Sequence, residues 1–296
     1  MILNDLTLST IRSGKGDCIH LRYNGHNLII DSGPTSSAGE FRKLCESILS
    51  TGEFLDALII THYDDDHIGG ILKVGDLGFH DIFFNAYNGA EGSENLSAAQ
   101  NQRLFRMLPS AITHAAVLSG DVIDIGGAKI TVHAPTDVSL AKARDQMKEA
   151  DLPLGAVSDW IYTFDELMER NYPSKDSSTS NQASIVFTFE HGTNKILFTG
   201  DAWEASIPAG SYDIVKLPHH GSARNISDEM IRRLNTNAFL ICGDGTSHPN
   251  KQTIAKLLML KEKLTIYGNY NWWMNGFLKP EDMKYIDSGR LEFRLT

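Results

Sequence analysis

The chain contains the same local pattern twice. Residues 17–33 hold two alternating apolar segments joined at Asn24-Gly25, and the second segment ends at Asp31. Residues 183–201 repeat this pattern around another glycine-containing turn and end at Asp201. A short glycine-containing turn between alternating segments indicates a β-hairpin. Each hairpin is followed by a helix-capable segment and an apolar strand that ends in histidines. We therefore predict two similar α/β halves with polar side chains gathered at strand ends, where such folds usually place their sites.

Hydrophobic periodicity predicts the remaining elements. The strands expected outside the repeated pattern are Asp81–Phe84, Ala116–Leu118, Lys129–His133, Leu264–Tyr267 and Arg290–Leu295. The expected helices are Ala38–Leu49, Val138–Ala150, Asp159–Met168, the short Trp203–Ile207 and Lys251–Leu260. No linker divides the chain, so we expect a single domain over residues 1–296, with a helical and loop insertion at about 137–180 that could cap a cleft.

Composition and charge exclude several classes of protein. Apolar residues make up 42% of the 296 residues, which is enough for a sizeable core and excludes global disorder. The formal net charge of −10 argues against a nucleic-acid coat protein, because no blanket of basic residues exists to hold a phosphate backbone. Cys18, Cys45 and Cys242 are spaced like neither a disulfide framework nor a zinc knuckle, so we expect buried thiols. With no visible signal peptide or membrane-length apolar run, we expect a cytoplasmic protein without membrane contact.

The strongest chemical signal is the segment at residues 61–70. His62, Asp64, Asp66 and His67 lie within six residues, directly after an apolar strand. Imidazole and carboxylate groups together suit zinc, manganese or iron better than calcium. The alternative, a solvated acidic turn at a helix start, does not explain two histidines beside an apolar strand. The segment therefore predicts a metal site.

Two later segments carry further candidate ligands. Asp201 ends an apolar strand, where its carboxylate could bridge two cations, although it could instead cap a short helix. The sequence Pro218-His219-His220-Gly221-Ser222 follows another apolar strand. A lone histidine at a strand end is more often structural, but an adjacent pair beside the first motif favours metal binding.

The order of these motifs resembles the metallo-β-lactamase fold superfamily. Within it, the sequence is similar to the hydrolase domain of the competence protein ComEC, and teichoic-acid phosphorylcholine esterases carry a similar His-His-Gly-Ser signature. The motifs that carry the resemblance span residues 14 to 249. They are Gly14-Lys-Gly-Asp17, Leu28-Ile-Ile-Asp31-Ser-Gly33, Asp64-Asp65-Asp66-His67-Ile-Gly-Gly, Asn181-x-x-Ser184-Ile-Val, Thr199-Gly-Asp201, Pro218-His-His-Gly-Ser and His248-Pro249.

The resemblance implies a four-layered αβ/βα sandwich of two mixed β-sheets flanked by helices, with a di-metal centre at its edge. The implied ligands are His62 and Asp64 for the first metal, Asp66 and His67 for the second, Asp201 between the two, and His219 or His220 to complete the second site. We favour His220 because it directly precedes a glycine. The expected metal is Zn²⁺, with Mn²⁺ or Mg²⁺ as alternatives.

The sequence departs from the superfamily pattern at the first metal. Asp64 stands where many members have histidine, and a carboxylate makes that site more favourable for manganese and magnesium as well as zinc. The third histidine of this site, expected a few residues before Ser184, is replaced by the region of Ser180 and Asn181. The first site is therefore expected to be the weaker of the two.

Several residues have expected supporting roles. Two cations bridged by Asp201 would lower the pKa of a water molecule to about 7, and Asp66 could orient that water. His248 could donate a proton to the leaving oxygen or contact phosphate, with helix capping as the alternative. Asp31 is expected to fix the ring of a ligand histidine, and Asp17 to organise its loop.

The expected reaction is phosphodiester hydrolysis by a metal-activated hydroxide, as in a phosphodiesterase or nuclease. The expected substrate is a phosphodiester or phosphate ester, including nucleic acid, and no protein partner is predicted. Alternatives are a small phosphate-ester or other ester hydrolase, as in phosphorylcholine esterases, and a weakly catalytic regulatory module stabilised by metal. Lys216 could contact phosphates. The aromatic residues between Tyr267 and Phe277 could stack bases or belong to the core.

Overall fold

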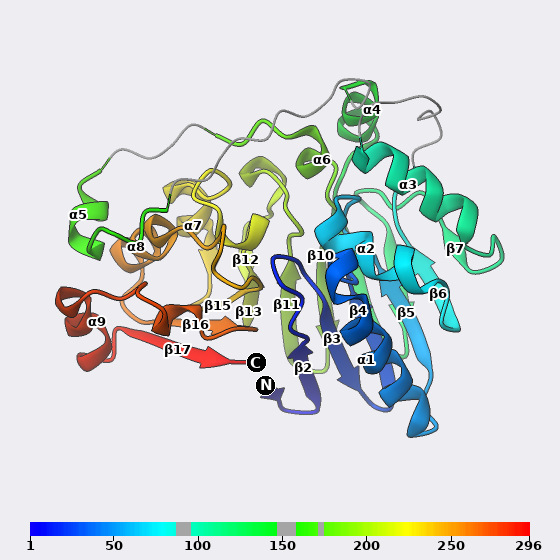
Figure 1. Cartoon of the computed structure of the whole chain (residues 1–296), viewed down its shortest axis with the longest axis horizontal. Helices are drawn as coiled ribbons and strands as arrows, with labels where there is room; N and C mark the ends of the chain where they lie inside the picture. The colour runs from blue at the N-terminus through cyan, green and yellow to red at the C-terminus, as the bar shows by residue number, and fades with distance from the viewer. Residues whose placement is uncertain (87–95, 147–157, 171–174) are drawn as a thin grey trace.

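The computed structural model describes residues 1–86, 96–146, 158–170 and 175–296. Two β-sheets lie face to face, and helices cover their outer surfaces (Figure 1). The two mixed sheets flanked by helices confirm the fold class predicted from the sequence. Parts of the predicted insertion, residues 147–157 and 171–174, lie outside the described residues. No helix in the described part of the chain is long and apolar enough to cross a membrane.

The first sheet has seven strands in the order β1-β2-β3-β4-β5-β6-β7. These are β1 Ile2–Leu3, β2 Leu6–Thr10, β3 Ile19–Tyr23, β4 His26–Ile30, β5 Leu55–Ile59, β6 Phe79–Phe83 and β7 Thr113–His114. Strands β1 to β4 pair antiparallel, and β4 to β7 pair parallel. The β3–β4 hairpin is the first copy of the pattern seen in the sequence. Its turn places Asn24 at φ 49° and Gly25 at φ 80°, the left-handed region that Asn-Gly adopts readily.

The second sheet has eight strands in the order β17-β16-β15-β13-β11-β10-β9-β8. These are β8 Val122–Ile125, β9 Ala128–Ala134, β10 Val186–His191, β11 Asn194–Phe198, β13 Ile214–Lys216, β15 Ala238–Ile241, β16 Leu264–Gly268 and β17 Leu291–Leu295. The β10–β11 hairpin is the second copy of the pattern. From β11 to β17 all neighbouring strands are parallel. A separate pair is formed by β12 Gly210–Ser211 and β14 Leu234–Asn235.

The described α-helices pack outside the sheets. They are α1 Ala38–Ser50, α2 Asp65–Val74, α3 Leu96–Met107, α4 Asp137–Gln146, α5 Phe164–Met168, α6 Thr179–Gln182, α7 Asp228–Arg233, α8 Lys251–Leu260 and α9 Met283–Asp287. Helix α8 has the predicted bounds, whereas α5 is shorter than predicted. The helix predicted at Trp203–Ile207 is one 3₁₀ turn at Glu204–Ser206.

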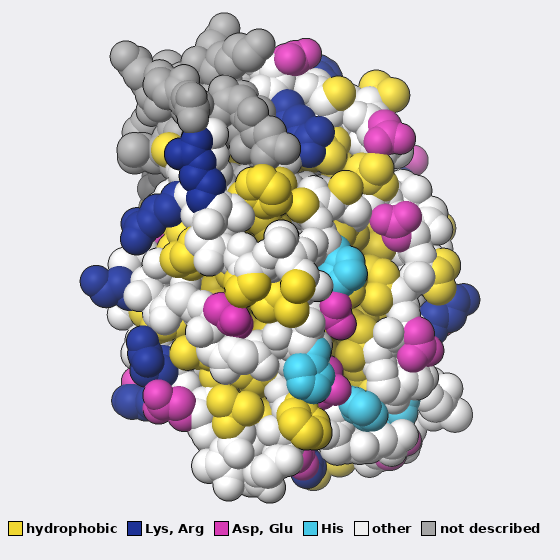
Figure 2. Space-filling model, turned by 90° about the vertical axis from the view of Figure 1, so that its right-hand side faces the viewer, with side chains coloured by type: hydrophobic (Ala, Val, Ile, Leu, Met, Phe, Trp, Pro, Cys, Tyr) yellow, Lys and Arg dark blue, Asp and Glu magenta, His cyan; other side chains and the backbone are white. Residues whose placement is uncertain are grey.

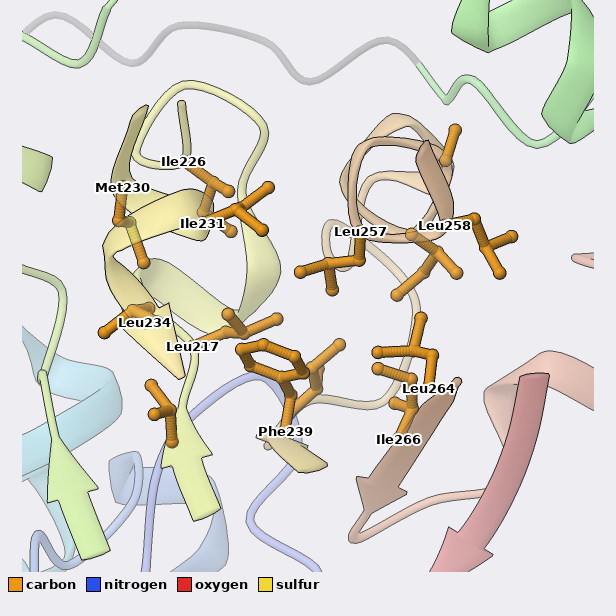
Figure 3. Packing of buried hydrophobic residues seen from close by; sticks show 14 of the residues in the cluster. Leu217, Ile226, Met230, Ile231, Leu234, Phe239, Leu257, Leu258, Leu264 and Ile266 are labelled. Atoms are coloured by element: carbon orange, nitrogen blue, oxygen red, sulfur yellow. The ribbon is translucent and has the colours of Figure 1, made fainter. Parts of the chain in front are cut away.

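Buried apolar residues form three clusters that hold the layers together. One lies between the sheets, where Leu21 of β3 and Phe189 of β10 belong to the same cluster. A second joins the first sheet to α1, α2 and α3. The third joins the second sheet to α5, α7 and α8, and Figure 3 shows Ile231 of α7 and Leu257 of α8 above Phe239 of β15. The centre of the predicted aromatic cluster is part of this core, because Trp272 and Phe277 are fully buried.

The strand predicted at Ala116–Leu118 does not form. A side chain takes the place of a neighbouring strand there. The Asn85 amide accepts a hydrogen bond from the Val117 N–H (2.7 Å) and donates one to the Val117 carbonyl (2.9 Å). The backbone of this segment is therefore satisfied without a β-ladder, which local apolar alternation could not reveal.

Basic side chains do not dominate the face of the molecule in Figure 2. Acidic side chains and histidines lie among apolar and uncharged groups there, and Lys and Arg lie mainly toward the margins of the described surface. This distribution agrees with the net charge of −10 and leaves this face without a broad surface for a polyanion.

Close packing against helix α2 requires two of its glycines. A Cβ added at Gly70 would lie 2.1 Å from the Ser32 carbonyl oxygen, and one at Gly69 would lie 2.1 Å from the Thr35 backbone nitrogen. Both neighbours are backbone atoms, which cannot swing aside as a side chain can. The two glycines therefore let the start of α2 pack against the loop that follows β4.

We predict that Gly70→Ala lowers the free energy of unfolding by about 2 kcal/mol or more, because overpacking must displace backbone. The matched control is Gly39→Ala in α1, where an added Cβ meets nothing within 4 Å. This control should leave stability unchanged or slightly raised, because alanine favours helix over glycine. Urea unfolding of both variants measures the difference, and equal stability would contradict the packing argument.

Candidate metal centre

Loops from both sheets deliver the predicted ligands to one place. The loop after β5 and the first turn of α2 carry His62, Asp64, Asp66 and His67. The other candidates follow strands of the second sheet, Asp201 after β11 and the His219-His220 pair after β13. The carboxyl ends of neighbouring parallel strands meet at one edge of a sheet, which is why residues so distant in sequence converge.

One group of ligand atoms surrounds His67 and His220. The His220 Nε2 atom lies 3.3 Å from Asp66 Oδ2 and 3.5 Å from Asp201 Oδ2. The His67 Nε2 atom lies 3.5 Å from Asp201 Oδ1 and 3.8 Å from Asp66 Oδ1. Ligand atoms of Asp66, His67 and His220 lie within 4.8 Å of one another, and Asp201 approaches both histidines.

A second group of ligand atoms also approaches Asp201. The His62 Nε2 atom is 3.7 Å from Asp64 Oδ2 and 4.0 Å from Asp201 Oδ2. The His219 Nε2 atom is 3.8 Å from the same Asp201 Oδ2. His219 thus lies close to Asp201, although the sequence lacks the expected third histidine of the first site. His248, predicted beside the centre, has its ring centroid 4.9 Å from that of His219.

The other ring nitrogen of each of three histidines has a fixed partner. His67 Nδ1 lies 2.8 Å from Asp31 Oδ2, the contact expected for Asp31. His220 Nδ1 lies 3.1 Å from the Cys242 carbonyl, and His219 Nδ1 lies 3.1 Å from Asn225 Oδ1. Donation from Nδ1 to these oxygens leaves Nε2 as the free acceptor that faces the centre.

Residues that replace the missing histidine support the group formed by His62, Asp64 and His219. The Ser180 hydroxyl donates to Asp64 Oδ2 (3.1 Å), and Asn181 Nδ2 donates to Asp176 Oδ2 (2.7 Å). Asp176 also accepts from Asn225 Nδ2 (2.8 Å), and Asn225 holds His219. No sequence motif marks Asp176 or Asn225, because their roles depend on contacts between distant segments.

An unusual backbone turn presents the two adjacent histidines. His219 and His220 have φ of 49° and 51°, in the left-handed region that non-glycine residues seldom adopt. In an extended strand, neighbouring side chains point to opposite faces. The left-handed turn instead lets both imidazoles face Asp201. Asp31, which orients His67, also has a left-handed φ of 58°.

The buried donor set fits a cation. The buried atoms without a hydrogen-bond partner in the described part of the chain include five candidate ligand atoms: His62 Nε2, His67 Nε2, His220 Nε2, Asp64 Oδ1 and Asp201 Oδ1. Buried polar atoms are rarely left without a partner, so such a cluster requires an explanation. Ligands about 2.0–2.2 Å from one tetrahedral ion lie roughly 3.3–3.6 Å apart, close to the separations observed here. Metal binding would satisfy these atoms.

The electrostatic field of the cluster also favours positive charge. Burial alone would lower the pKa of His220, but the carboxylates of Asp201 and Asp17 raise it to about 10. Burial would raise the pKa of Asp201, but His220 and His67 hold it well below its usual range. The cluster therefore stabilises either protons on its imidazoles or cations between its ligands.

Asp17 and Lys216 form a buried layer beneath the ligands. Asp17 Oδ1 lies 3.2 Å from His220 Nδ1, and its other oxygen pairs with the Lys216 ammonium. Lys216 is 1% exposed, donates to the Gly200 carbonyl (2.9 Å) and lies 3.6 Å from Asp201 Oδ1. Asp17 therefore does more than organise its loop, and Lys216 is not placed to meet substrate as the sequence suggested.

A cavity of about 270 Å³ opens beside Asp66, His219 and His220. Its lining comprises Lys15, Asp66, His219, His220, Gly243, Asp244, Ser247 and His248. Burial, together with the nearby His219 and His220, lowers the pKa of His248 to about 3, so its ring is neutral at physiological pH. The centre is thus accessible to a small substrate group through a mixed polar cavity.

A family model for the metallo-β-lactamase superfamily matches residues 12–246 of the chain. The chain belongs to this superfamily. Its members are metal-dependent hydrolases and are typically zinc-dependent. Membership therefore places this chain among metal-dependent hydrolases, and the unpartnered donors described above are candidate metal ligands.

Solved structures are similar to the chain at low sequence identity. The metallo-β-lactamase fold protein YhfI from Bacillus subtilis is 11% identical, with a TM-score of 0.47 over 98% of this chain and 96% of that one. Zn²⁺-bound PqqB from Methylobacterium extorquens is 13% identical, with a TM-score of 0.45 over 95% and 85% of the two chains. No curated protein sequence matches the chain significantly.

We predict that Lys216→Met lowers the free energy of unfolding by about 3–5 kcal/mol, because it leaves Asp17 as a buried carboxylate without its ammonium partner. The matched control is Lys195→Met, which removes a surface pair with Glu190 (3.0 Å) and should cost at most about 1 kcal/mol. Chemical denaturation after metal chelation measures both changes. Equal effects would contradict a structural role for the buried pair.

Proposed function

We propose that the chain is a di-metal phosphodiesterase, similar to the hydrolase domain of ComEC. The observation that carries the proposal is the position of Asp201 between two groups of ligand atoms beside an open cavity. The ligand assignment we propose is His62, Asp64, Asp201 and His219 for the first metal, and Asp66, His67, Asp201 and His220 for the second. Both histidines of the pair are then used, whereas the sequence suggested only one.

Two bound cations would supply a hydroxide nucleophile at neutral pH and stabilise negative charge on the attacking and leaving oxygens. Asp66 contributes to both the ligand cluster and the cavity wall, so its carboxylate is positioned to orient the attacking water. His248, on the same wall, is neutral and can donate a hydrogen bond to a phosphate oxygen. Of the two roles suggested by the sequence, the neutral ring favours phosphate contact over proton delivery.

The charges in the cavity support an anionic substrate. Lys15 lines the cavity and forms no ion pair or hydrogen bond among the described residues. Its loop lies directly against the ligand segment, because Asp17 N–H donates to the Asp66 carbonyl (3.1 Å). A Cβ at Gly16 would be 1.9 Å from that carbonyl oxygen, so glycine permits this approach. A free ammonium fixed beside the metal ligands is suited to a phosphate group.

A second candidate function has its own support. Asp244 also lines the cavity and could attract a cationic headgroup, as a phosphorylcholine ester would present. One of its oxygens, Oδ1, already accepts from the Thr246 N–H (2.9 Å) and hydroxyl (2.7 Å). This leaves Asp244 less available than Lys15, so we favour the phosphodiester. The alternative of a weakly catalytic regulatory module was based on the missing third histidine of the first metal site. In the proposed assignment, His219 supplies that ligand.

We predict that the protein binds two equivalents of transition metal at saturation. His219→Ala and His220→Ala should each reduce this to about one equivalent, because each removes the imidazole ligand of a different site. His114→Ala is the control, since His114 is exposed and pairs with Asp81 away from the cluster (2.7 Å). Elemental analysis and titration calorimetry measure the stoichiometry. A protein with no affinity for zinc or manganese would overturn the metal assignment.

We predict hydrolysis of bis-p-nitrophenyl phosphate by chelated protein resupplied with metal, at least as fast with manganese as with zinc. The oxygen-rich first site explains this preference. Asp66→Ala and Asp201→Ala should reduce turnover by about a thousandfold or more. Their circular dichroism should be unchanged, because each loses charge from the centre and not volume from the core.

Two controls distinguish the competing functions. Asp287→Ala alters an exposed helix-end carboxylate and should retain full turnover. A panel of p-nitrophenyl phosphorylcholine, carboxylic esters, single-stranded DNA, duplex DNA and RNA should show activity on phosphodiesters of nucleic-acid type. Activity confined to phosphorylcholine or carboxylic esters would favour the second candidate. Turnover retained by either aspartate variant would exclude the di-metal mechanism.

A further inference from the structure

Strand β17 ends the second sheet and has an open edge. It pairs with β16 on one side, and in the described part of the chain no strand pairs with its other side. An open strand edge is a template for pairing with another chain, and proteins usually protect it with charged side chains, proline or a bulge. The sequence Leu291-Glu292-Phe293-Arg294-Leu295 contains no proline, its two charged residues have opposite signs, and its register with β16 is continuous.

The backbone of β17 is oriented for such pairing. Arg290 accepts a hydrogen bond from the Leu264 N–H, and the Thr296 N–H donates to the Gly268 carbonyl. Even-numbered residues therefore direct their backbone groups toward β16. Because the direction alternates along a strand, Leu291, Phe293 and Leu295 present their N–H and C=O groups to the open edge.

The strand is complementary to itself in the antiparallel direction. If Phe293 of one copy lies opposite Phe293 of another, Leu291 lies opposite Leu295 and Glu292 lies opposite Arg294. In this register the residues with outward backbone groups form the hydrogen-bonded pairs. Glu292 and Arg294 then form the closer pairs without hydrogen bonds, where side-chain contact is strongest. Every cross-strand pair is therefore apolar with apolar or acid with base.

We propose that β17 pairs antiparallel with β17 of a second copy of this chain, giving a two-fold symmetric dimer with a sheet continuous across both subunits. The self-complementary register satisfies the requirement that a two-fold interface brings the same surface together. The partner at this edge is a second copy and not an unrelated peptide, because Glu292 and Arg294 lie symmetrically on either side of Phe293. Two antiparallel copies of the strand therefore place each acid opposite a base.

A hollow beside the strand provides the apolar part of the interface. A cavity of about 460 Å³ is lined mainly by apolar side chains, including Trp273, Met283, Leu291 and Phe293. Leu295 is 55% exposed, so in one subunit it remains largely in water. In the proposed register, Leu295 of the second copy lies opposite Leu291 and on the same face of the sheet. It would therefore bury its side chain at this hollow. By symmetry, Leu295 of the first copy would do the same at the hollow of the second.

The charged residues fix the register. Within one chain, Arg294 Nε lies 2.7 Å from Glu292 Oε1, and the two side chains are 54% and 43% exposed. In the dimer, each carboxylate would lie between its own Arg294 and that of the other copy. A shift by two residues would lose these pairs. The other charged residue that lines the hollow is Lys263, which directly precedes β16. Because it is basic, it does not repel Glu292.

A charge-swap series tests the pairing. Light scattering and sedimentation velocity should give twice the chain mass of 32.7 kDa for the wild-type protein. Glu292→Arg, which places four arginines together, should weaken the dimer by about tenfold or more. The double variant Glu292→Arg/Arg294→Glu should restore the wild-type dissociation constant to within about threefold, because it exchanges the two charges.

Two further variants guard against unfolding and general charge effects. Leu295→Pro removes an N–H that only the second copy would use, so it should yield a monomer with the circular dichroism of the folded wild-type protein. Glu46→Arg reverses an exposed charge on α1 and should leave the dimer intact. None of these residues lines the metal cavity, so hydrolysis should be retained throughout.

Three outcomes would overturn the proposal. The first is a wild-type protein that stays monomeric up to about 0.1 mM, which would leave the edge free or available to another partner. The second is a dimer that Glu292→Arg does not weaken. The third is failure of the double variant to recover dimerisation. The metal and substrate measurements above are independent of all three.

Discussion

Concentration of carboxylates in a buried centre is the constraint on which the rest of this structure depends. Asp17, Asp31, Asp64, Asp66 and Asp201 each place an oxygen within 4.0 Å of an imidazole nitrogen of His62, His67 or His220. Lys216 is the ammonium group paired with this cluster. With neutral imidazoles, the cluster carries a surplus of four negative charges, which two divalent cations would neutralise. The surrounding fold holds these groups together against their mutual repulsion.

The two-sheet architecture supplies that restraint. Ligands from the first sheet are carried by the loop before α2, and those from the second follow β11 and β13. The apolar cluster between the sheets fixes the distance between the two sets. Because neither half contains a complete ligand set, metal binding depends on the contact between halves. The fold alone does not determine which substrate is hydrolysed. Substrate choice depends on the residues that line the cavity, among them Lys15 and Asp244.

Much of this arrangement could be predicted from local sequence. The two hairpins follow from their turns and alternating segments, and the ligand motifs lie where parallel strands end. The strand expected at Ala116–Leu118 was wrong because Asn85, far away in the sequence, satisfies its backbone. The roles of Lys216 and Asn225 also depend on contacts between distant segments. The approach of both adjacent histidines to Asp201 follows from left-handed backbone angles, which residue type alone does not indicate.

The left-handed turn at His219 and His220 has a consequence for how such a centre can evolve. In the proposed assignment, two consecutive codons specify ligands for two different ions. A single-residue deletion or insertion in this turn would remove an imidazole from both sites together. Loss of one metal at a time would then require substitution of one of the two histidines. β-branched residues are disfavoured as replacements because the backbone is left-handed at both positions. Descendants of this chain with one ion would therefore arise by substitution, whereas a change in the length of this turn would remove both ions together.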